Sequence, residues 1–74
     1  MNVYKAYDML NHFYPTYVIV SSNEDDAYKA LLDEIERASV VYGWEDKPES
    51  IVEGYEIYFV CDVIDGETTI AEDI

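Results

Sequence analysis

The sequence predicts an α+β domain in which one helix packs on a small antiparallel sheet, with the elements in the order ββαββ. Three patterns lead to this prediction. Apolar residues recur at helical spacing between residues 24 and 42, residues 55–64 alternate with a period of two, and residues 17–20 are β-branched or aromatic. A chain of 74 residues with half of its residues apolar is expected to form a single compact domain over residues 1–74.

The first element, residues 3–10, fits two patterns. A helix would place Val3, Tyr7 and Leu10 on one face. A strand would separate two alternating sets, with Val3, Lys5, Tyr7 and Met9 on one face and Tyr4, Ala6, Asp8 and Leu10 on the other. We favour the strand, which would form a first hairpin with residues 16–21 across the NHFYP loop.

The clearest element is the helix that follows the strand at residues 17–20. Ser22 or Asn23 can cap its start, and its first turn contains the acidic run of residues 24–26, which complements the helix dipole. At 100° per residue, one face collects Ala27, Leu31, Ile35, Ala38 and Tyr42, with Tyr28 at its edge. This face is expected to cover the sheet. Gly43 is placed to end the helix in a left-handed conformation, and the segment WEDKPESIVEG is expected to be a connecting loop.

The last two predicted strands surround an Asp65-Gly66 step. Residues 55–64 alternate between Tyr55, Ile57, Phe59, Cys61 and Val63 on one face and Glu56, Tyr58, Val60, Asp62 and Ile64 on the other. This alternation predicts a half-buried strand. Asp-Gly is a strong signal for a type I′ hairpin turn, so ETTIAED is expected to pair back onto residues 55–64 as the last strand.

Charge is the most unusual feature of the composition, with a formal net charge of −13. Residues 1–44 hold seven acids and three bases (3 − 7 = −4), whereas residues 45–74 hold ten acids and one base (1 − 10 = −9). Such a field repels nucleic acid and anionic membranes and attracts basic proteins. Direct binding to nucleic acid or to a membrane is therefore not expected.

Residue types that support catalysis or metal binding are sparse. His12 is the only histidine and Cys61 the only cysteine, so a zinc site and an internal disulfide are both excluded. We expect Cys61 to be a buried core thiol and His12 to be a loop residue. Ser39 has no neighbouring base, and no glycine-rich phosphate loop is present. The sequence predicts a protein that is not an enzyme and that has no cofactor.

An EF-hand register around Gly66 fails on ligand chemistry. With Gly66 at the sixth loop position, Glu72 falls correctly at the twelfth and Asp65 at the fifth. The first and third positions are then Cys61 and Val63, which cannot supply hard oxygen ligands. The acidic segment DVIDGETTIAED is thus predicted to be a hairpin rather than a calcium loop.

The acidic second half is the candidate partner-binding surface. Ordinary surfaces mix both signs of charge, whereas this half has almost no counter-charge. The eight tyrosines of the whole chain are more than so small a core can hold, and tyrosine suits an interface. Acids at every second strand position would lie about 6.6 Å apart and could meet successive basic side chains. The predicted contact set is Glu45, Asp46, Glu49, Glu53, Glu56, Asp62, Asp65 and Glu67, with Trp44 and Tyr58 as aromatic anchors.

In size, acidity and α+β pattern the chain resembles small phage-encoded inhibitors of bacterial defence, especially anti-CRISPR and anti-restriction proteins that occupy nucleic-acid sites by mimicry. The resemblance covers the whole chain and rests on composition. It implies a protein that binds the basic groove of a CRISPR effector or restriction enzyme. A single cysteine, the absence of a signal-like N-terminus and the absence of a long apolar run favour the cytoplasm of a host bacterial cell.

The alternative is a small structural or regulatory adaptor, which could be a homodimer. In that case the acidity would serve solubility, and exposed strand edges would serve assembly.

Overall fold

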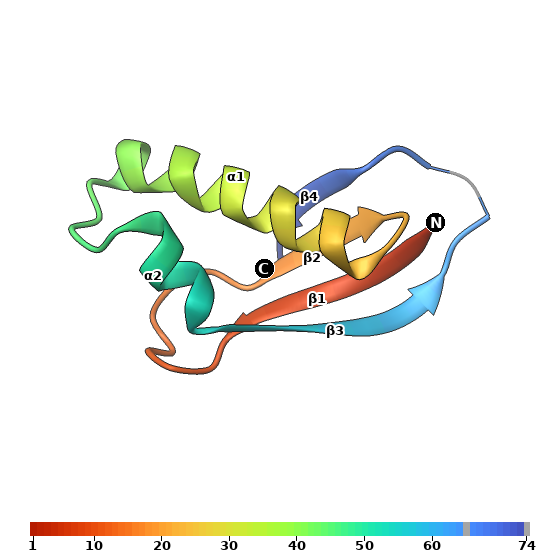
Figure 1. Cartoon of the computed structure of the whole chain (residues 1–74), viewed down its shortest axis with the longest axis horizontal. Coiled ribbons are helices and arrows are strands. Elements are labelled where there is room, and N and C mark those ends of the chain that lie inside the picture. Colours follow the sequence, from red (N-terminus) through yellow and green to blue (C-terminus); the bar gives the residue numbers. More distant parts are fainter. Residues whose placement is uncertain (65, 74) are drawn as a thin grey trace.

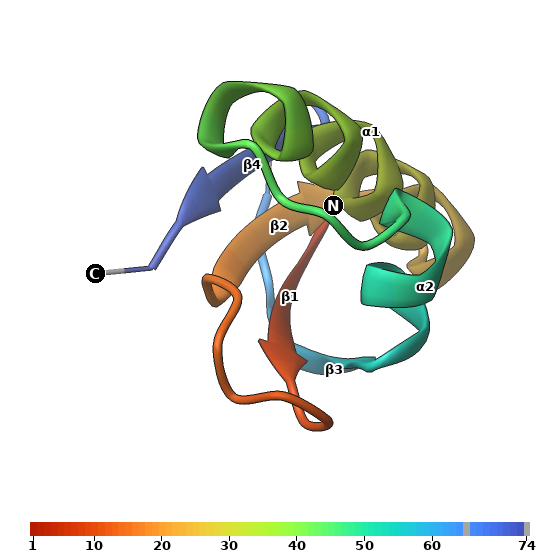
Figure 2. The same cartoon turned by 90° about the vertical axis from the view of Figure 1, so that its left-hand side faces the viewer.

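The computed structural model describes residues 1–64 and 66–73. Its elements are β1 (Asn2–Asp8), β2 (Tyr17–Ser21), α1 (Glu24–Tyr42), α2 (Pro48–Glu53), β3 (Tyr55–Asp62) and β4 (Thr69–Glu72). The strands form one antiparallel sheet, and both helices lie on the same face of it (Figure 1). Neither helix lies on the other face, which we call the open face (Figure 2). The predicted α+β class and the strand at the N-terminus are confirmed.

The first hairpin supplies the centre of the core. β1 and β2 pair from Asn2↔Ser21 to Ala6↔Tyr17. Because paired residues point to the same face, alternate residues of both strands are turned toward the helices. These residues join apolar side chains from both helices in the core cluster, which consists of Tyr4, Ala6, Tyr17, Ile19, Ala27, Leu31, Ile35, Ile51 and Val52.

Both ends of α1 follow the predicted capping chemistry. The Asn23 side chain accepts a hydrogen bond from the Asp26 backbone N–H at 2.8 Å, and Gly43 adopts a left-handed conformation with φ 68° and ψ 36°. Tyr42 was expected on the core face, and this prediction is wrong, since Tyr42 is 60% exposed. The physical reason is length. The 19 residues of α1 span about 28 Å, whereas the five of β2 span about 17 Å, so the last turn of α1 has no strand beneath it.

The segment after α1 contains a second helix, α2, so the prediction of a plain connecting loop is wrong. Pro48 occupies the first turn of α2, where its fixed φ is favourable and its missing N–H costs nothing. Ile51 and Val52 are each 1% exposed. Six residues are too few to produce a periodic signal in a sequence, and a helix this short is stabilised by the burial of these side chains rather than by its own propensity.

The strand order is β3-β1-β2-β4, which places β3 and β4 at opposite edges of the sheet. The prediction that the last strand pairs with β3 is therefore wrong, because β4 pairs with β2 through Val18↔Ala71 and Ile19↔Ile70. Asp65, half of the predicted turn, lies outside the described residues. Two free edges were available to β4, and the edge of β2 lets Ile70 pack against the core.

A β-bulge divides β3 into two parts. Tyr4 pairs with Phe59 but Val3 pairs with Cys61, so Val60 is an extra residue on β3. The extra residue reverses which side chains face which side of the sheet. Glu56 and Tyr58 therefore belong to the open face, whereas Asp62 belongs to the helix side. The prediction that these three residues share one face is wrong, and so is the prediction of a buried Cys61, which is exposed.

Candidate protein-binding surface

Few of the acidic side chains are neutralised within the chain. Of the seventeen acids, all but Asp65 lie in the described residues, and two of these sixteen form ion pairs. Lys5 Nζ lies 3.0 Å from Asp73 Oδ2 on the open face. Arg37 Nε donates to Glu34 Oε1 at 2.9 Å on α1, and this hydrogen bond raises the pKa of the guanidinium. Most of the negative charge is thus available to a partner.

Asp8 is an exception, because it is buried and organises a loop. Its carboxylate accepts hydrogen bonds from three backbone N–H groups, those of Asn11 at 3.0 Å and of Phe13 and Tyr14 at 3.2 Å each. Burial raises the pKa of Asp8, but the backbone hydrogen bonds outweigh burial and hold the pKa below its usual value. The segment between β1 and β2 is therefore held in one conformation by a charged group.

Two further contacts attach this loop to the rest of the domain. The Gly54 carbonyl accepts from the N–H groups of Met9 at 2.9 Å and Leu10 at 3.3 Å. The Tyr55 hydroxyl, whose pKa is raised by burial, donates to the Pro15 carbonyl. Hydrogen bonds therefore hold the loop at its start, through Met9 and Leu10, in its middle, through the contacts to Asp8, and at its end, through Pro15.

The loop places aromatic rings beside the end of α1. Phe13 packs edge-on against Tyr14 with ring centroids 5.2 Å apart, and Tyr14 packs edge-on against Trp44 at 4.8 Å. Trp44 stacks on Tyr42 at 5.5 Å with an interplanar angle of 26°. We call these four residues, together with Glu45 and Asp46, the aromatic end. The two connections that contain or adjoin these residues, between β1 and β2 and between α1 and α2, lie at the end of the molecule that faces the viewer in Figure 2.

Carboxylates are integrated into the aromatic end. The Tyr14 hydroxyl donates to Asp46 Oδ2 at 2.7 Å. Burial and this hydrogen bond raise the pKa of Tyr14 to about 12. Trp44 follows the left-handed Gly43, and its backbone N–H donates to the Ser39 carbonyl at 3.1 Å, which fixes the position of the Trp44 backbone. The rings and the carboxylates therefore form one connected unit.

The predicted contact set does not form a continuous strip. Trp44, Glu45 and Asp46 belong to the aromatic end. Glu49 and Glu53 lie on α2 and at its end, and Glu56 and Tyr58 lie on the open face. Asp62 is at the far end of β3, about 20 Å from Glu56 by strand rise, and Glu67 is in the segment before β4. Asp65 lies outside the described residues.

Exposure agrees with a contact role for these groups. Every described acid of the predicted set is exposed, Tyr58 is 48% exposed and Trp44 is half-buried. Sequence reasoning missed Phe13, Tyr14 and Tyr42. The surplus of tyrosine was a usable signal, but which rings remain outside depends on how far α1 extends past the sheet.

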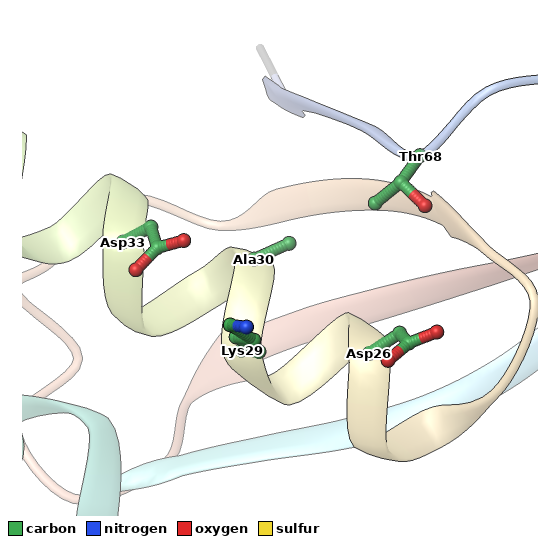
Figure 3. Close-up of a pocket in the computed structure, with 5 residues that line it drawn as sticks. All are labelled: Asp26, Lys29, Ala30, Asp33 and Thr68. Atoms are coloured by element: carbon green, nitrogen blue, oxygen red, sulfur yellow. The ribbon is translucent and has the colours of Figure 1, made fainter.

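The structure also contains a shallow hollow, lined by Asp26, Lys29, Ala30 and Asp33 of α1 and by Thr68 (Figure 3). Its volume of about 230 Å³ is below the roughly 300–1,000 Å³ of typical small-molecule sites. In Figure 3 Lys29 lies between the two carboxylates along the helix. Within residues 1–64 and 66–73, no group of three His, Cys, Asp or Glu side chains could hold a metal ion.

The two residues with reactive side chains are separated. His12 is exposed in the loop, where its Nδ1 is 3.0 Å from the Tyr7 hydroxyl, and it has a positive φ of 53°. Cys61 is exposed at the far end of β3. A Cys-His pair of the kind used in nucleophilic catalysis is thus not assembled by these two residues.

Fold and surface together define a two-layer α+β domain with many acidic and aromatic side chains exposed on its surface. Comparisons of the chain with protein-family models, with curated proteins and with solved structures found no match. Among the described residues, no helix has the length and apolar character needed to cross a membrane.

Proposed function

We propose that this protein is an inhibitor that binds the basic nucleic-acid-binding site of a bacterial defence complex, namely a CRISPR effector or a restriction enzyme, by charge mimicry. The observation that carries the proposal is the surplus of carboxylates without a counter-charge, since fourteen of the sixteen described acids form no ion pair within the described chain and all of these except Asp8 are exposed. A net charge this far from zero destabilises a small domain through self-repulsion. A partner that neutralises the charge removes that cost.

The dimensions support the same proposal. The molecule measures 38 × 23 × 20 Å, so thirteen net negative charges along 38 Å correspond to one charge per about 2.9 Å. Duplex DNA carries one charge per about 1.7 Å and each of its strands one per about 3.4 Å. The charge per unit length is thus close to that of a single nucleic-acid strand.

The distribution of the acids supports a channel as the target. The predicted set extends from the aromatic end over α2 to the open face and the far end of β3, rather than along one side. A flat basic patch would reach only part of this set. A channel that surrounds a nucleic-acid strand would reach most of it.

Competition binding tests the proposal directly. A fluorescently labelled target DNA is bound to a purified CRISPR effector or restriction enzyme, and the protein is titrated at salt concentrations between 50 and 300 mM. We expect the protein and the DNA to exclude each other, with an affinity for the enzyme that falls as salt rises. A complex in which guide and target DNA binding is unchanged at every salt concentration would rule out mimicry.

Charge neutralisation tests the predicted contact set. The triple variant Glu49→Gln, Glu53→Gln, Glu56→Gln removes three acids of the set, and the control Glu24→Gln, Asp33→Asn, Glu36→Gln removes three from α1. Both change the net charge by the same amount. We expect the first variant to lose at least tenfold more affinity for the enzyme than the control, and equal losses would show that only total charge matters.

The open face favours a second candidate function, that of a homodimeric adaptor. On this face Val18 and Val20 are half-buried, Tyr58 is 48% exposed, and charge is limited to Glu56 and the Lys5–Asp73 pair. Light scattering coupled to size exclusion discriminates the two functions. A stable homodimer that is insensitive to charge reversal would favour the adaptor.

A further inference from the structure

The aromatic end exposes ring surface that packing within the domain does not use. Tyr42 is 60% exposed and Phe13 is 72% exposed, while the rings between them, Tyr14 and Trp44, are half-buried. Trp44 stacks on Tyr42, and more than half of the Tyr42 surface remains exposed to solvent. The face of an aromatic ring carries partial negative charge and attracts cations.

The end of α1 adds a second source of negative potential at the same place. The C-terminus of a helix carries about half a negative charge, which proteins often complement with Lys or Arg in the last turn. The last turn of α1, to which Tyr42 belongs, contains no basic residue. The dipole is therefore available to a cation from outside the chain.

Two carboxylates complete the arrangement. Glu45 and Asp46 follow directly after Trp44, and both are exposed. Asp46 is oriented by the Tyr14 hydroxyl at 2.7 Å, and Tyr14 is oriented in turn by the Asp8 carboxylate through its own N–H. Because Asp46 and Tyr14 are held before a partner arrives, little conformational entropy of these two side chains remains to be lost on binding.

We propose that the aromatic end is a docking site for arginine side chains of a basic partner protein. A guanidinium stacks on the exposed face of Tyr42, and Glu45 and Asp46 pair with it or with a neighbouring basic residue. Arginine fits better than lysine, because its planar guanidinium both stacks on rings and binds carboxylates in a bidentate manner. The inference rests on the proposed function and specifies which part of the surface discriminates between partners.

Charge argues against two other occupants. A second copy of the chain would bring its own Glu45 and Asp46 against the first, and nucleic-acid bases would bring phosphates into the same negative potential. A positively charged segment is the occupant that complements rings, dipole and carboxylates together.

Peptide titration tests the docking site, using octa-arginine and octa-lysine as probes. Trp44 is the only tryptophan, so its fluorescence reports binding at this end of the molecule. We expect octa-arginine to bind about three- to fivefold more tightly than octa-lysine, because the guanidinium both stacks on a ring and pairs with carboxylates in a bidentate manner. Tyr42→Leu is expected to reduce this preference, because it weakens octa-arginine binding more than octa-lysine binding, whereas Tyr42→Phe retains the preference.

Matched controls separate the site from general charge attraction. Tyr28 is an exposed tyrosine elsewhere on α1, at 46% exposure, and Tyr28→Leu is expected to leave the preference intact. Glu45→Gln is expected to weaken octa-arginine binding more than Glu24→Gln, which removes the same charge. Circular dichroism and the urea midpoint confirm that each variant is folded.

The outcomes distinguish this inference from the proposed function. Equal affinity for the two peptides, unchanged in Tyr42→Leu, would overturn the arginine site. The competition between protein and target DNA would be unaffected by that result, since charge mimicry needs no aromatic contact. A Tyr42→Leu variant whose arginine preference is smaller than that of Tyr28→Leu supports the site, whether or not the enzyme tested is the target.

Discussion

At the scale of single residues, Asp8 connects the buried core to the surface that the protein presents. It is 1% exposed, and its three backbone hydrogen bonds position the loop that carries Phe13 and Tyr14. The Asp8 pKa is lowered in the folded state. A group with a lowered folded pKa stabilises the fold above its unfolded pKa of about 3.9, and this stabilisation is lost as the pH falls through the folded pKa.

The variant Asp8→Asn tests this role. It keeps one carbonyl acceptor but places an amide N–H₂ group near backbone donors, so we expect a loss of about 1–3 kcal/mol in the free energy of unfolding at pH 7. The difference from the unchanged protein should shrink as the pH falls below about 4, because Asp8 itself becomes protonated. Urea titrations at several pH values between 7 and 2 measure this difference. A loss that is the same at every pH would show that the charge of Asp8 is not involved.

At the scale of elements, the position of β4 decides which surfaces the sheet exposes. Since β4 occupies the edge of β2, the other edge strand is β3, with eight residues against the four of β4. Long exposed edge strands invite pairing with other chains, and bulges reduce that tendency. The bulge at Val60 therefore has two effects, since it interrupts this edge and turns Asp62 to the side opposite Glu56.

Nuclear Overhauser effects test the strand order. We expect cross-strand contacts between Val18 and Ala71 and between Ile19 and Ile70, together with contacts between Lys5 and Tyr58. Contacts between residues 69–72 and residues 55–62 would instead support the Asp65-Gly66 hairpin expected from the sequence. Amide hydrogen exchange provides a second measure. The backbone N–H groups on the outer edge of β2 are protected only if β4 pairs with that edge.

At the scale of the whole molecule, repulsion among the negative charges is expected to lower the stability of the fold. The net charge is −13, and the described residues contain two ion pairs to offset it. Repulsion between exposed charges is screened by salt, with a Debye length of about 30 Å at 0.01 M and about 8 Å at 0.15 M. The extended shape, 38 Å along its longest axis, places many of these charges within reach of one another at low salt but not at physiological salt.

We therefore expect the free energy of unfolding to rise with NaCl between 0.01 and 0.15 M, by on the order of 1 kcal/mol. The double variant Asp62→Lys, Glu67→Lys lowers the net negative charge by four, so it should be at least as stable as the unchanged protein and gain less from salt. The same variant should bind a basic target more weakly. Stability that falls with added salt, or a variant that loses stability while binding is unaffected, would show that these carboxylates are structural.

Local sequence was sufficient to predict the structure wherever the contacts that determine it are between residues close along the chain. Asn23 and Gly43 determine where α1 begins and ends, through hydrogen bonds to residues three or four positions away. The alternation in residues 2–8 and 17–21 depends only on a period of two. The charge of the second half, and the inclusion of Trp44, Glu45 and Asp46 in the candidate surface, likewise follow from composition and order alone. These features do not depend on which distant segments meet.

The remaining features depend on competition between distant segments for one small core. β4 could pair with either of two free sheet edges and pairs with β2. α2 is stabilised by the burial of Ile51 and Val52. The bulge in β3 determines the sides of the sheet on which Glu56 and Asp62 lie. The aromatic end arose in the same way, since Tyr42 is left outside only because α1 is longer than the strands it covers. No local pattern contains these lengths and edges, because each is a relation between elements that is established only when they pack together.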